Sequence, residues 1–295
     1  MSIFISSIGF GLIAAAILAI ASVGFTMQFG ITSILNLAYA DVMTAAAFVA
    51  YSLNKAGLDI WVCAAAGALF GAVFSMLLNR MVYARFAQRG TSAVGLVIVS
   101  IGIGLIVQYV VVIIWSPNFV SYRLSQGATV QLGSLVFTTL QLTVIGIAVL
   151  AMTAVHLVLT YTKLGRAMRA TAVNVSLARD CGIATDRIVD LAWLISGAMC
   201  GLAGVIFAMS IISFTPASEQ GFLVVVIAAA IVGGIGKAYG AMLGALVLGV
   251  ATELAALVID PAYKDVVAFL LLAVVLLVRP RGILSGLATK EEVVA

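Results

Sequence analysis

The sequence predicts an all-α, polytopic helical membrane protein with eight to ten transmembrane helices, at least one of them broken. Of its 295 residues, 64% are hydrophobic and only 9% are charged, whereas a soluble domain carries about 25% charged residues. No Asp, Glu, Lys or Arg occurs before Asp41. One helical span needs roughly 20 apolar residues, so this composition suffices for roughly nine spans. We therefore predict a single transmembrane domain over residues 1–295.

Nine apolar runs define the predicted helices in order. They are Ile3–Phe29, Ile31–Leu53, Ile60–Leu78, Ala93–Trp115, Leu135–Tyr161, Ile188–Ser213, Phe222–Ile235, Ala238–Ile259 and Val266–Val278. The first run is longer than the apolar region of about 7–15 residues in a secretory signal and has no basic residue before it, so we expect a retained span. The seventh and ninth runs are short, which favours broken helices or helices enclosed by protein.

Basic residues in short loops predict the orientation, because Lys and Arg are enriched on the cytoplasmic side. They fall in three segments: Arg80, Arg85 and Arg89; Lys163, Arg166, Arg169, Arg179 and Arg187; and Arg279, Arg281 and Lys290. We expect these segments to be cytoplasmic and residues 116–134, which carry only Arg123, to lie outside. The N-terminus should then also lie outside if the first three runs all cross. A second run that is broken or re-entrant, and so does not cross the membrane, would place the N-terminus on the cytoplasmic side instead.

Metal and catalytic chemistry have little support in the sequence. Cys63, Cys181 and Cys200 are odd in number, far apart and without a CxxC pair, and His156 is the only histidine. We expect no metal site and no cofactor bound by this chain. The absence of HExxH and GxSxG motifs argues against an intramembrane enzyme.

The basic segment of about residues 163–187 is too long for an ordinary helix–helix turn of 2–8 residues. Good helix formers from Ala167 to Ala178 predict a short helix near the membrane surface. Gly182 can end this helix, and Thr185 or Asp186 can cap the next span. Two interpretations stay open: a loop that only sets topology, or a helix presented to a cytoplasmic partner.

The second run is the candidate translocation path. A helix break near residues 30–33 would leave a helix N-terminus inside the membrane, where it can hold a substrate carboxylate. Asn36 and Tyr39 have the spacing to share a helix face. Asp41 is a costly charge within a span and is expected to face a cavity or a partner. The alternative is a solvated position near the interface. Gln108 in the fourth run is a further candidate.

Glycines in the eighth run predict close helix packing. Gly236, Gly240 and Gly244 are four residues apart and are expected to line one helix face. Glu253, later in the same run, could line an outer vestibule of the path or reach toward the outer surface near Asp260.

Four stretches in order resemble the permease subunits of bacterial ABC importers, in the high-affinity branched-chain amino acid family and the first of its two permease types. They are ILNLAYADVMTAAAFVAY (34–51), GRAMRATAVNVSLARDCGI (165–183), IVGGIGKAYGAMLGALVLG (231–249) and VLLVRPRGILSG (275–286). The family pattern N-F/L-A-H-G-E/D is matched by Asn36 and Asp41, but Tyr39 replaces its histidine and Ala40 its glycine. These departures put the particular solute in doubt.

The resemblance implies a multi-pass protein of the bacterial inner membrane that moves branched-chain or related amino acids inward by alternating access. It also implies that the 163–187 segment docks on an ATPase. The docking candidates are Arg166, Arg169, Ala170, Ala172, Asn174, Ala178, Gly182 and Ile183. Because the chain has no GxxxxGK[ST] loop, ATP and Mg²⁺ would bind to partner subunits.

The implied partners are a second related permease, two ATPase subunits and a periplasmic binding protein. Urea or short amides are the alternative solutes within this class of transporter. The rival class is an ion-coupled secondary transporter or a channel.

Overall fold

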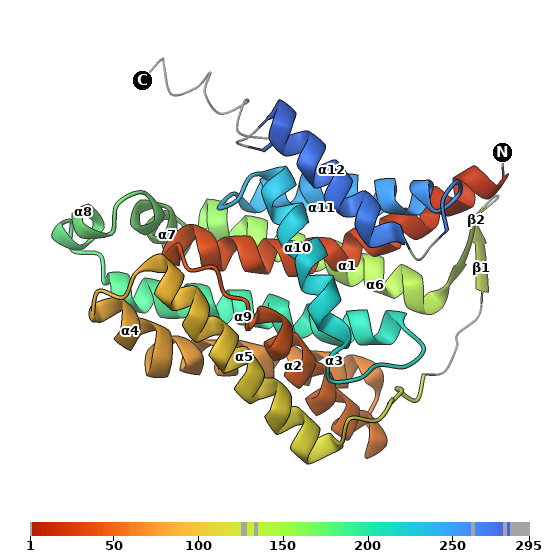
Figure 1. Cartoon of the computed structure of the whole chain (residues 1–295), viewed down its shortest axis with the longest axis horizontal. Helices are drawn as coiled ribbons and strands as arrows, with labels where there is room; N and C mark the ends of the chain where they lie inside the picture. Colours follow the sequence, from red (N-terminus) through yellow and green to blue (C-terminus); the bar gives the residue numbers. More distant parts are fainter. Residues whose placement is uncertain (1, 125–128, 133–134, 261–262, 280–281, 284–295) are drawn as a thin grey trace. The chain divides into compact units, whose positions relative to one another are not determined.

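The computed structural model describes residues 2–124, 129–132, 135–260, 263–279 and 282–283. The elements, labelled in Figure 1, are mostly helices. They are α1 Ser2–Thr32, α2 Tyr39–Lys55, α3 Ile60–Leu78, the π-helix η1 Asn79–Tyr83, α4 Ala84–Gln88, α5 Ala93–Trp115, β1 Thr129–Leu132, β2 Leu135–Thr138, α6 Thr139–Tyr161, α7 Lys163–Val173, α8 Val175–Asp180, α9 Thr185–Ser210, α10 Ser218–Gly233, α11 Ala238–Ala255 and α12 Lys264–Val278.

Six helices in the described part of the chain are long and apolar enough to cross a membrane. They are Ser7–Thr32, Ile60–Gln88, Ala93–Trp115, Thr139–Tyr161, Thr185–Ser210 and Ala238–Ala255. The polytopic helical class is confirmed, but the predicted number of eight to ten spans is not. The difference arises in α2, α10 and α12, which have 17, 16 and 15 residues, fewer than the roughly 20 of a full span.

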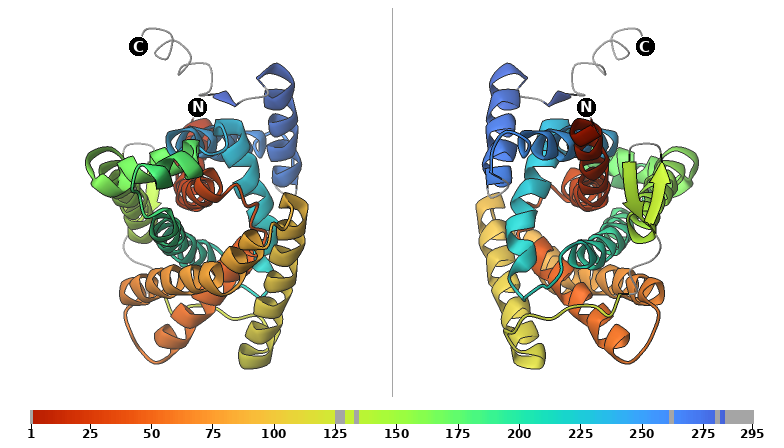
Figure 2. Two further views of the ribbon diagram at one scale, coloured as in Figure 1. Left: turned by 90° about the vertical axis from the view of Figure 1, so that its left-hand side faces the viewer. Right: turned by 90° about the vertical axis from the view of Figure 1, so that its right-hand side faces the viewer.

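A β-hairpin and one turn of π-helix are present that the sequence did not predict. β1 and β2 pair antiparallel, with Val130 opposite Phe137, and Figure 2 shows them as adjacent arrows in its right-hand view. The fifth apolar run therefore begins as a strand at Leu135 and becomes α6 only at Thr139. Its β-branched and aromatic residues suit the pleated backbone.

The chain divides into two compact units, each made of separate stretches of sequence. The first contains the described residues within 1–26, 125–150 and 224–295. In this unit α11 packs closely on its neighbours. A Cβ atom added at Gly240 or Gly244 would overlap backbone atoms of Gly233 and Ala229 in α10. Gly236 has φ +85° and lies in the turn before α11, so the expectation that it shares their helix face is wrong.

The second unit contains residues 27–124 and 151–223. Its centre is the antiparallel pair of α3 and α9, in which glycines of each helix face the other's backbone. A Cβ at Gly71 would overlap Gly197 and Gly201, and a Cβ at Gly201 would overlap Gly67. Removing side chains at these positions lets the two helices approach closely, as in small-xxx-small membrane contacts. α2 packs against both helices and completes the centre of the unit.

An aromatic cluster fixes the chain after α5 onto α2. Phe48 lies 5.2 Å from Phe214 and 5.7 Å from Trp115, measured between ring centroids. Tyr122 lies 5.1 Å from Phe214, and its hydroxyl donates to the carbonyl of Ala47 over 2.8 Å. The cluster holds residues 116–124 against one end of α2.

Candidate translocation site and coupling segment

The break between α1 and α2 is the centre of the candidate site. α1 ends at Thr32, and the next helix begins only at Tyr39. Ser33 has φ +53°, which an L-residue adopts at a cost, and the Thr32 hydroxyl accepts a hydrogen bond from Ile34 N–H over 3.3 Å. The predicted break near residues 30–33 is therefore present and begins at Ser33, the last residue of that interval.

Side chains from other helices hold the broken segment in place. The hydroxyl of Ser100 on α5 accepts from Leu37 N–H over 3.1 Å. The amide oxygen of Asn36 accepts from the Tyr83 hydroxyl over 2.8 Å, and both residues are buried. Because Asn36 precedes α2, it does not share a helix face with Tyr39 as the spacing suggested. A peptide segment without helical bonds in apolar surroundings needs such partners.

Asp41 lies in the first turn of α2 and is 6% exposed. Its Oδ1 accepts from Gln220 Nε2 over 3.5 Å, and its Oδ2 lies against Gly104 so closely that a Cβ there would overlap it. The carboxylate is thus enclosed by α2, α5 and α10. The carboxylate is therefore buried within the protein and not freely solvated. A negative charge at this end of a helix is favoured by the helix dipole.

Glu219 is a second buried acid beside Asp41 and escaped the sequence analysis. It is 0% exposed, and its Oε2 lies 2.5 Å from the Thr44 hydroxyl. Its Oε1 has no hydrogen-bond partner among the described residues. The sequence missed it because the seventh apolar run was placed from Phe222, whereas α10 begins at Ser218. Two side-chain hydrogen bonds join the N-terminal turns of α2 to that of α10. One pairs Thr44 with Glu219, and the other pairs Asp41 with Gln220.

The remaining path candidates lie in different places. Tyr39 is buried, and its carbonyl accepts from the Cys200 thiol over 3.3 Å. Gln108 is partly buried on α5, one turn after Gly104 on the same face. Glu253 belongs to the first unit, where Lys264 contacts its Oε1 over 2.6 Å. This ion pair gives Glu253 a partner within its own unit, and its place in the path stays a prediction.

Tyr122, in the segment that follows α5, reports on the surroundings of Glu219. Burial, reinforced by the nearby carboxylate of Glu219, raises the pKa of the Tyr122 phenol far above its ordinary value. The phenol therefore stays neutral and donates to the Ala47 carbonyl. This hydrogen bond holds the segment against α2.

The basic segment forms two helices and not one. α7 ends at Val173 and α8 begins at Val175, because Asn174 leaves the helical conformation with φ −155° and ψ 106°. The Asn174 side chain accepts from Leu177 N–H over 3.0 Å and caps α8. The predicted helix from Ala167 to Ala178 is therefore interrupted at a residue whose side chain competes well for backbone donors.

The end of α8 confirms the role expected of Gly182. It has φ +82°, with Ile183 N–H bonded to the Ala178 carbonyl over 3.0 Å and Gly182 N–H to the Arg179 carbonyl over 2.9 Å. These two bonds form a Schellman motif. Ala184 is the cap residue of α9, so the expected capping by Thr185 or Asp186 is wrong.

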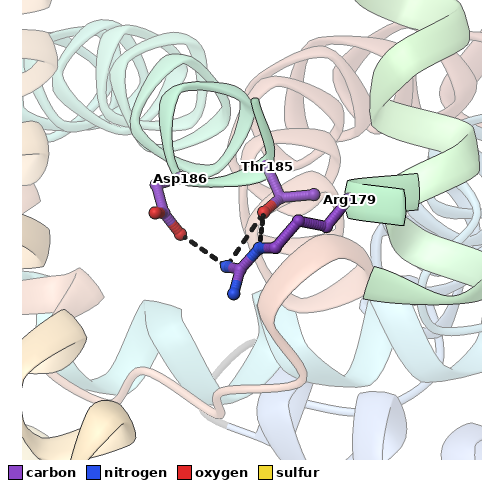
Figure 3. A network of polar contacts seen from close by, with 3 residues as sticks. All are labelled: Arg179, Thr185 and Asp186. Atoms are coloured by element: carbon purple, nitrogen blue, oxygen red, sulfur yellow. Dashed lines mark hydrogen bonds and ion pairs between the residues drawn. The ribbon is translucent and has the colours of Figure 1, made fainter. Parts of the chain in front are cut away.

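Thr185 and Asp186 bind Arg179 instead. The guanidinium donates to the Thr185 hydroxyl over 3.1 and 3.2 Å and to Asp186 over 3.0 Å. Figure 3 shows the Arg179 side chain reaching from α8 to the first turn of α9. The network fastens the short helix α8 to the start of α9.

The predicted docking residues divide between the surface and the interior. Arg166, Ala170 and Ala172 are exposed, as are Asn174 and Gly182, and Ile183 is half-buried. Ala178 is only 5% exposed, so it faces the interior of the segment. Arg169 donates to the carbonyl of Leu159, which occupies its guanidinium at the end of α6.

An exposed apolar tip on the segment was missed. Val173, Val175 and Leu177 are 88%, 44% and 60% exposed. They alternate with polar residues in the stretch VNVSL, and this contrast within a basic loop was the available signal. We call these three residues the apolar tip.

The C-terminal basic residues complete the survey. Arg279 ends α12, and its guanidinium donates to the Ile283 carbonyl over 3.4 Å. Arg281 and Lys290 lie outside the described residues.

Comparison with known proteins decides the family. The model of the family described as branched-chain amino acid transport system / permease component matches residues 7–276. The chain belongs to this permease family. The match includes the break between α1 and α2, the two buried acids and the basic segment discussed above.

Named relatives of the permease cover it almost end to end. The high-affinity branched-chain amino acid transport system permease protein LivH of Escherichia coli K12 is 33% identical over 90% of this chain and 91% of its own length. BraD of Pseudomonas aeruginosa, a permease protein of the same kind of system, is 30% identical over 93% of this chain and 94% of its own length. A probable LivH of Methanocaldococcus jannaschii is 26% identical over 90% of this chain and 88% of its own length. No solved structure matches the permease.

Proposed function

We propose that this chain is the transmembrane permease subunit of an ATP-driven ABC importer that moves branched-chain or related amino acids inward by alternating access. The observation that carries the proposal is the family match over residues 7–276, together with relatives named for this transport. A multi-pass location in a bacterial inner membrane agrees with six apolar helices.

The proposed partners are a second related permease, two ATPase subunits that hold ATP and Mg²⁺, and a periplasmic binding protein. The apolar tip supports a protein partner for α7 and α8, because three exposed apolar side chains on a basic segment gain by being covered. Arg166 is the best charged candidate for this contact, since Arg169 and Arg179 are bound within the chain.

The proposed path passes the broken helix and its two buried acids. An amino acid carries an ammonium and a carboxylate. Asp41 already supplies the negative charge favoured at the N-terminus of α2, and Glu219 lies beside it. A substrate carboxylate would be repelled there, so the site accepts the ammonium group. This proposal differs from the expectation, drawn from the sequence, that the helix N-terminus holds the carboxylate.

Uptake by a reconstituted complex tests the function. The permease pair, its ATPases and the binding protein in liposomes should accumulate leucine only with ATP and binding protein present. Excess isoleucine or valine should compete, whereas urea and acetamide should not. Uptake by this chain alone, driven by a proton or sodium gradient without ATP, would instead establish a secondary transporter. Competition by urea or acetamide alone would move the solute to the amide class.

Glu219→Gln tests the ammonium site. The substitution keeps the shape of the side chain but replaces the carboxyl group, which can accept from an ammonium group through either oxygen, by an amide with a single accepting oxygen. A hydrogen bond to a charged group is worth about 1.5–3 kcal/mol, so the KM for leucine should rise about tenfold or more. Asp59→Asn is the matched control. Asp59 is an exposed loop residue that caps the N-terminus of α3, and Asn caps a helix equally well. An unchanged KM in Glu219→Gln would remove Glu219 from the path.

A further inference from the structure

The long helix that begins with α3 contains one turn of π-helix at Asn79–Tyr83. Its signature is the bond from Ala84 N–H to the Asn79 carbonyl, which spans five residues where an α-helix spans four. Such a turn fits an additional residue into the helix and is frequent at functional sites. Here it turns three polar side chains toward two other parts of the second unit.

Two of these side chains bind the first part of α9. Asn79 Nδ2 donates to Asp190 Oδ1 over 2.9 Å, and Arg80 Nε donates to Asp190 Oδ2 over 2.6 Å. Both carboxylate oxygens are therefore engaged from the π-turn. The Asp190 side chain is 14% exposed and the Arg80 side chain 57%, so water reaches the ion pair from the arginine side, and the Asn79 hydrogen bond is the more sheltered of the two contacts.

The third side chain binds the broken helix. The Tyr83 hydroxyl donates to Asn36 Oδ1 over 2.8 Å, in the segment between α1 and α2. The Tyr83 ring packs on Trp193 of α9 with centroids 4.8 Å apart. Tyr83 and Trp193 are both 0% exposed, so the π-turn has little freedom to move without α9 and Asn36.

These contacts continue the network that fastens α8 to α9. Arg179 of α8 binds Thr185 and Asp186 at the beginning of α9, and Asp190 follows one turn later. Each step joins short rigid elements by charge-assisted or buried hydrogen bonds. A displacement of α8 would therefore be carried by α9 to the π-turn and by Tyr83 to the broken helix.

We propose that the π-turn Asn79–Tyr83 is the joint through which the α7–α8 segment acts on the translocation path. Asp190 and Tyr83 are its positioning residues: Asp190 joins α9 to the π-turn, and Tyr83 joins the π-turn to Asn36. The proposal rests on the importer function proposed above. It adds the internal route by which ATP hydrolysis on a partner changes the position of the broken helix.

The experiment compares ATP hydrolysis and leucine uptake in the same liposomes. The wild-type complex is measured first, so that absent ATP-driven uptake counts against the importer function and not against the joint. Tyr83→Phe removes only the hydroxyl, and Asp190→Asn removes the charge that holds Arg80. Loss of one buried hydrogen bond changes an equilibrium constant by about three- to tenfold. The amount of leucine moved per ATP should therefore fall by about that factor, while the rate of ATP hydrolysis is retained.

Tyr109→Phe is the matched control. Tyr109 is 62% exposed on α5, away from the π-turn in sequence, and the same hydroxyl is removed. We expect its uptake per ATP to equal that of the wild type. The thermal midpoint of all variants is measured alongside, because a purely structural role would lower stability, hydrolysis and uptake together.

The double variant decides whether the two residues act in series. If Asp190 and Tyr83 belong to one route, the double variant loses no more uptake per ATP than the worse single variant. The proposed joint would be overturned if the losses of the two single variants multiply in the double variant. It would also be overturned if leucine uptake per ATP is unchanged in the single variants, which includes the case in which hydrolysis and uptake fall equally. Should Asp190→Asn fail to assemble, the ratio in Tyr83→Phe still decides the second half of the route.

Discussion

Asp41 illustrates how far single residues of the site follow from the sequence. A charge in an apolar run was visible and correctly marked as costly. The enclosure of the Asp41 carboxylate was not visible in the sequence, because it depends on Gly104, which lies 63 positions later in the chain. Gly104 leaves room for the carboxylate only because it has no side chain. Tyr83, whose hydroxyl holds Asn36, was likewise not visible in a basic loop.

Gly104→Ala should damage the site through one added methyl group. The new Cβ would overlap Asp41 Oδ2, so the carboxylate or α5 must shift, at about 1–3 kcal/mol. We expect a lower thermal midpoint and reduced leucine uptake. Gly102→Ala on the same helix has no atom within 4 Å of its Cβ and should leave both unchanged. Equal behaviour of the two variants would show that the space beside Asp41 is not needed.

At the scale of elements, helix positions were predictable and helix ends were less so. Ile60–Leu78 and Ala93–Trp115 coincide with the predicted runs, because long apolar stretches admit few alternatives. The interruption at Asn174 and the π-turn at Asn79 depend on local backbone competition and on distant partners, which hydropathy does not contain. The hairpin of β1 and β2 was missed because its strands have only four residues each and β2 is continuous with an apolar run.

The packing of α3 on α9 predicts a strong effect from one substitution. Gly71→Val would place a branched side chain against the backbone of Gly197 and Gly201. Backbone cannot move aside as a side chain can, so we expect about 3 kcal/mol of destabilisation, visible in thermal unfolding in detergent. Gly146→Val on α6, where a Cβ meets no atom within 4 Å, should unfold like the wild type. A tolerated Gly71→Val would mean that the helices do not approach this closely.

At the scale of the whole molecule, the class of protein was predictable from composition and the family from four ordered motifs. The predicted eight to ten spans are not confirmed, because three apolar runs form helices shorter than a full span. The predicted docking residues stay a prediction, and the sequence analysis did not include the apolar tip among them. Resemblance pointed to small and basic residues, whereas exposure marks Val173, Val175 and Leu177.

The apolar tip should carry much of the affinity for the ATPase. Central apolar anchors of an interface often cost 2 kcal/mol or more when lost, so Val173→Asp with Leu177→Asp should weaken co-purification of the ATPase about tenfold or more. Leu58→Asp is the control, because Leu58 is also exposed but lies in the loop between α2 and α3. Undiminished recovery of the ATPase with the tip variant would assign docking to the basic residues alone.

The tip also has a consequence for the life of the protein in the cell. If the proposed ATPase covers this tip on the cytoplasmic side, copies made in excess of it would leave Val173, Val175 and Leu177 uncovered, and unfolded or exposed apolar surface is open to chaperones and proteases. Surplus copies should then be degraded, and the steady abundance of this protein should follow the supply of its scarcest companion more closely than its own rate of synthesis.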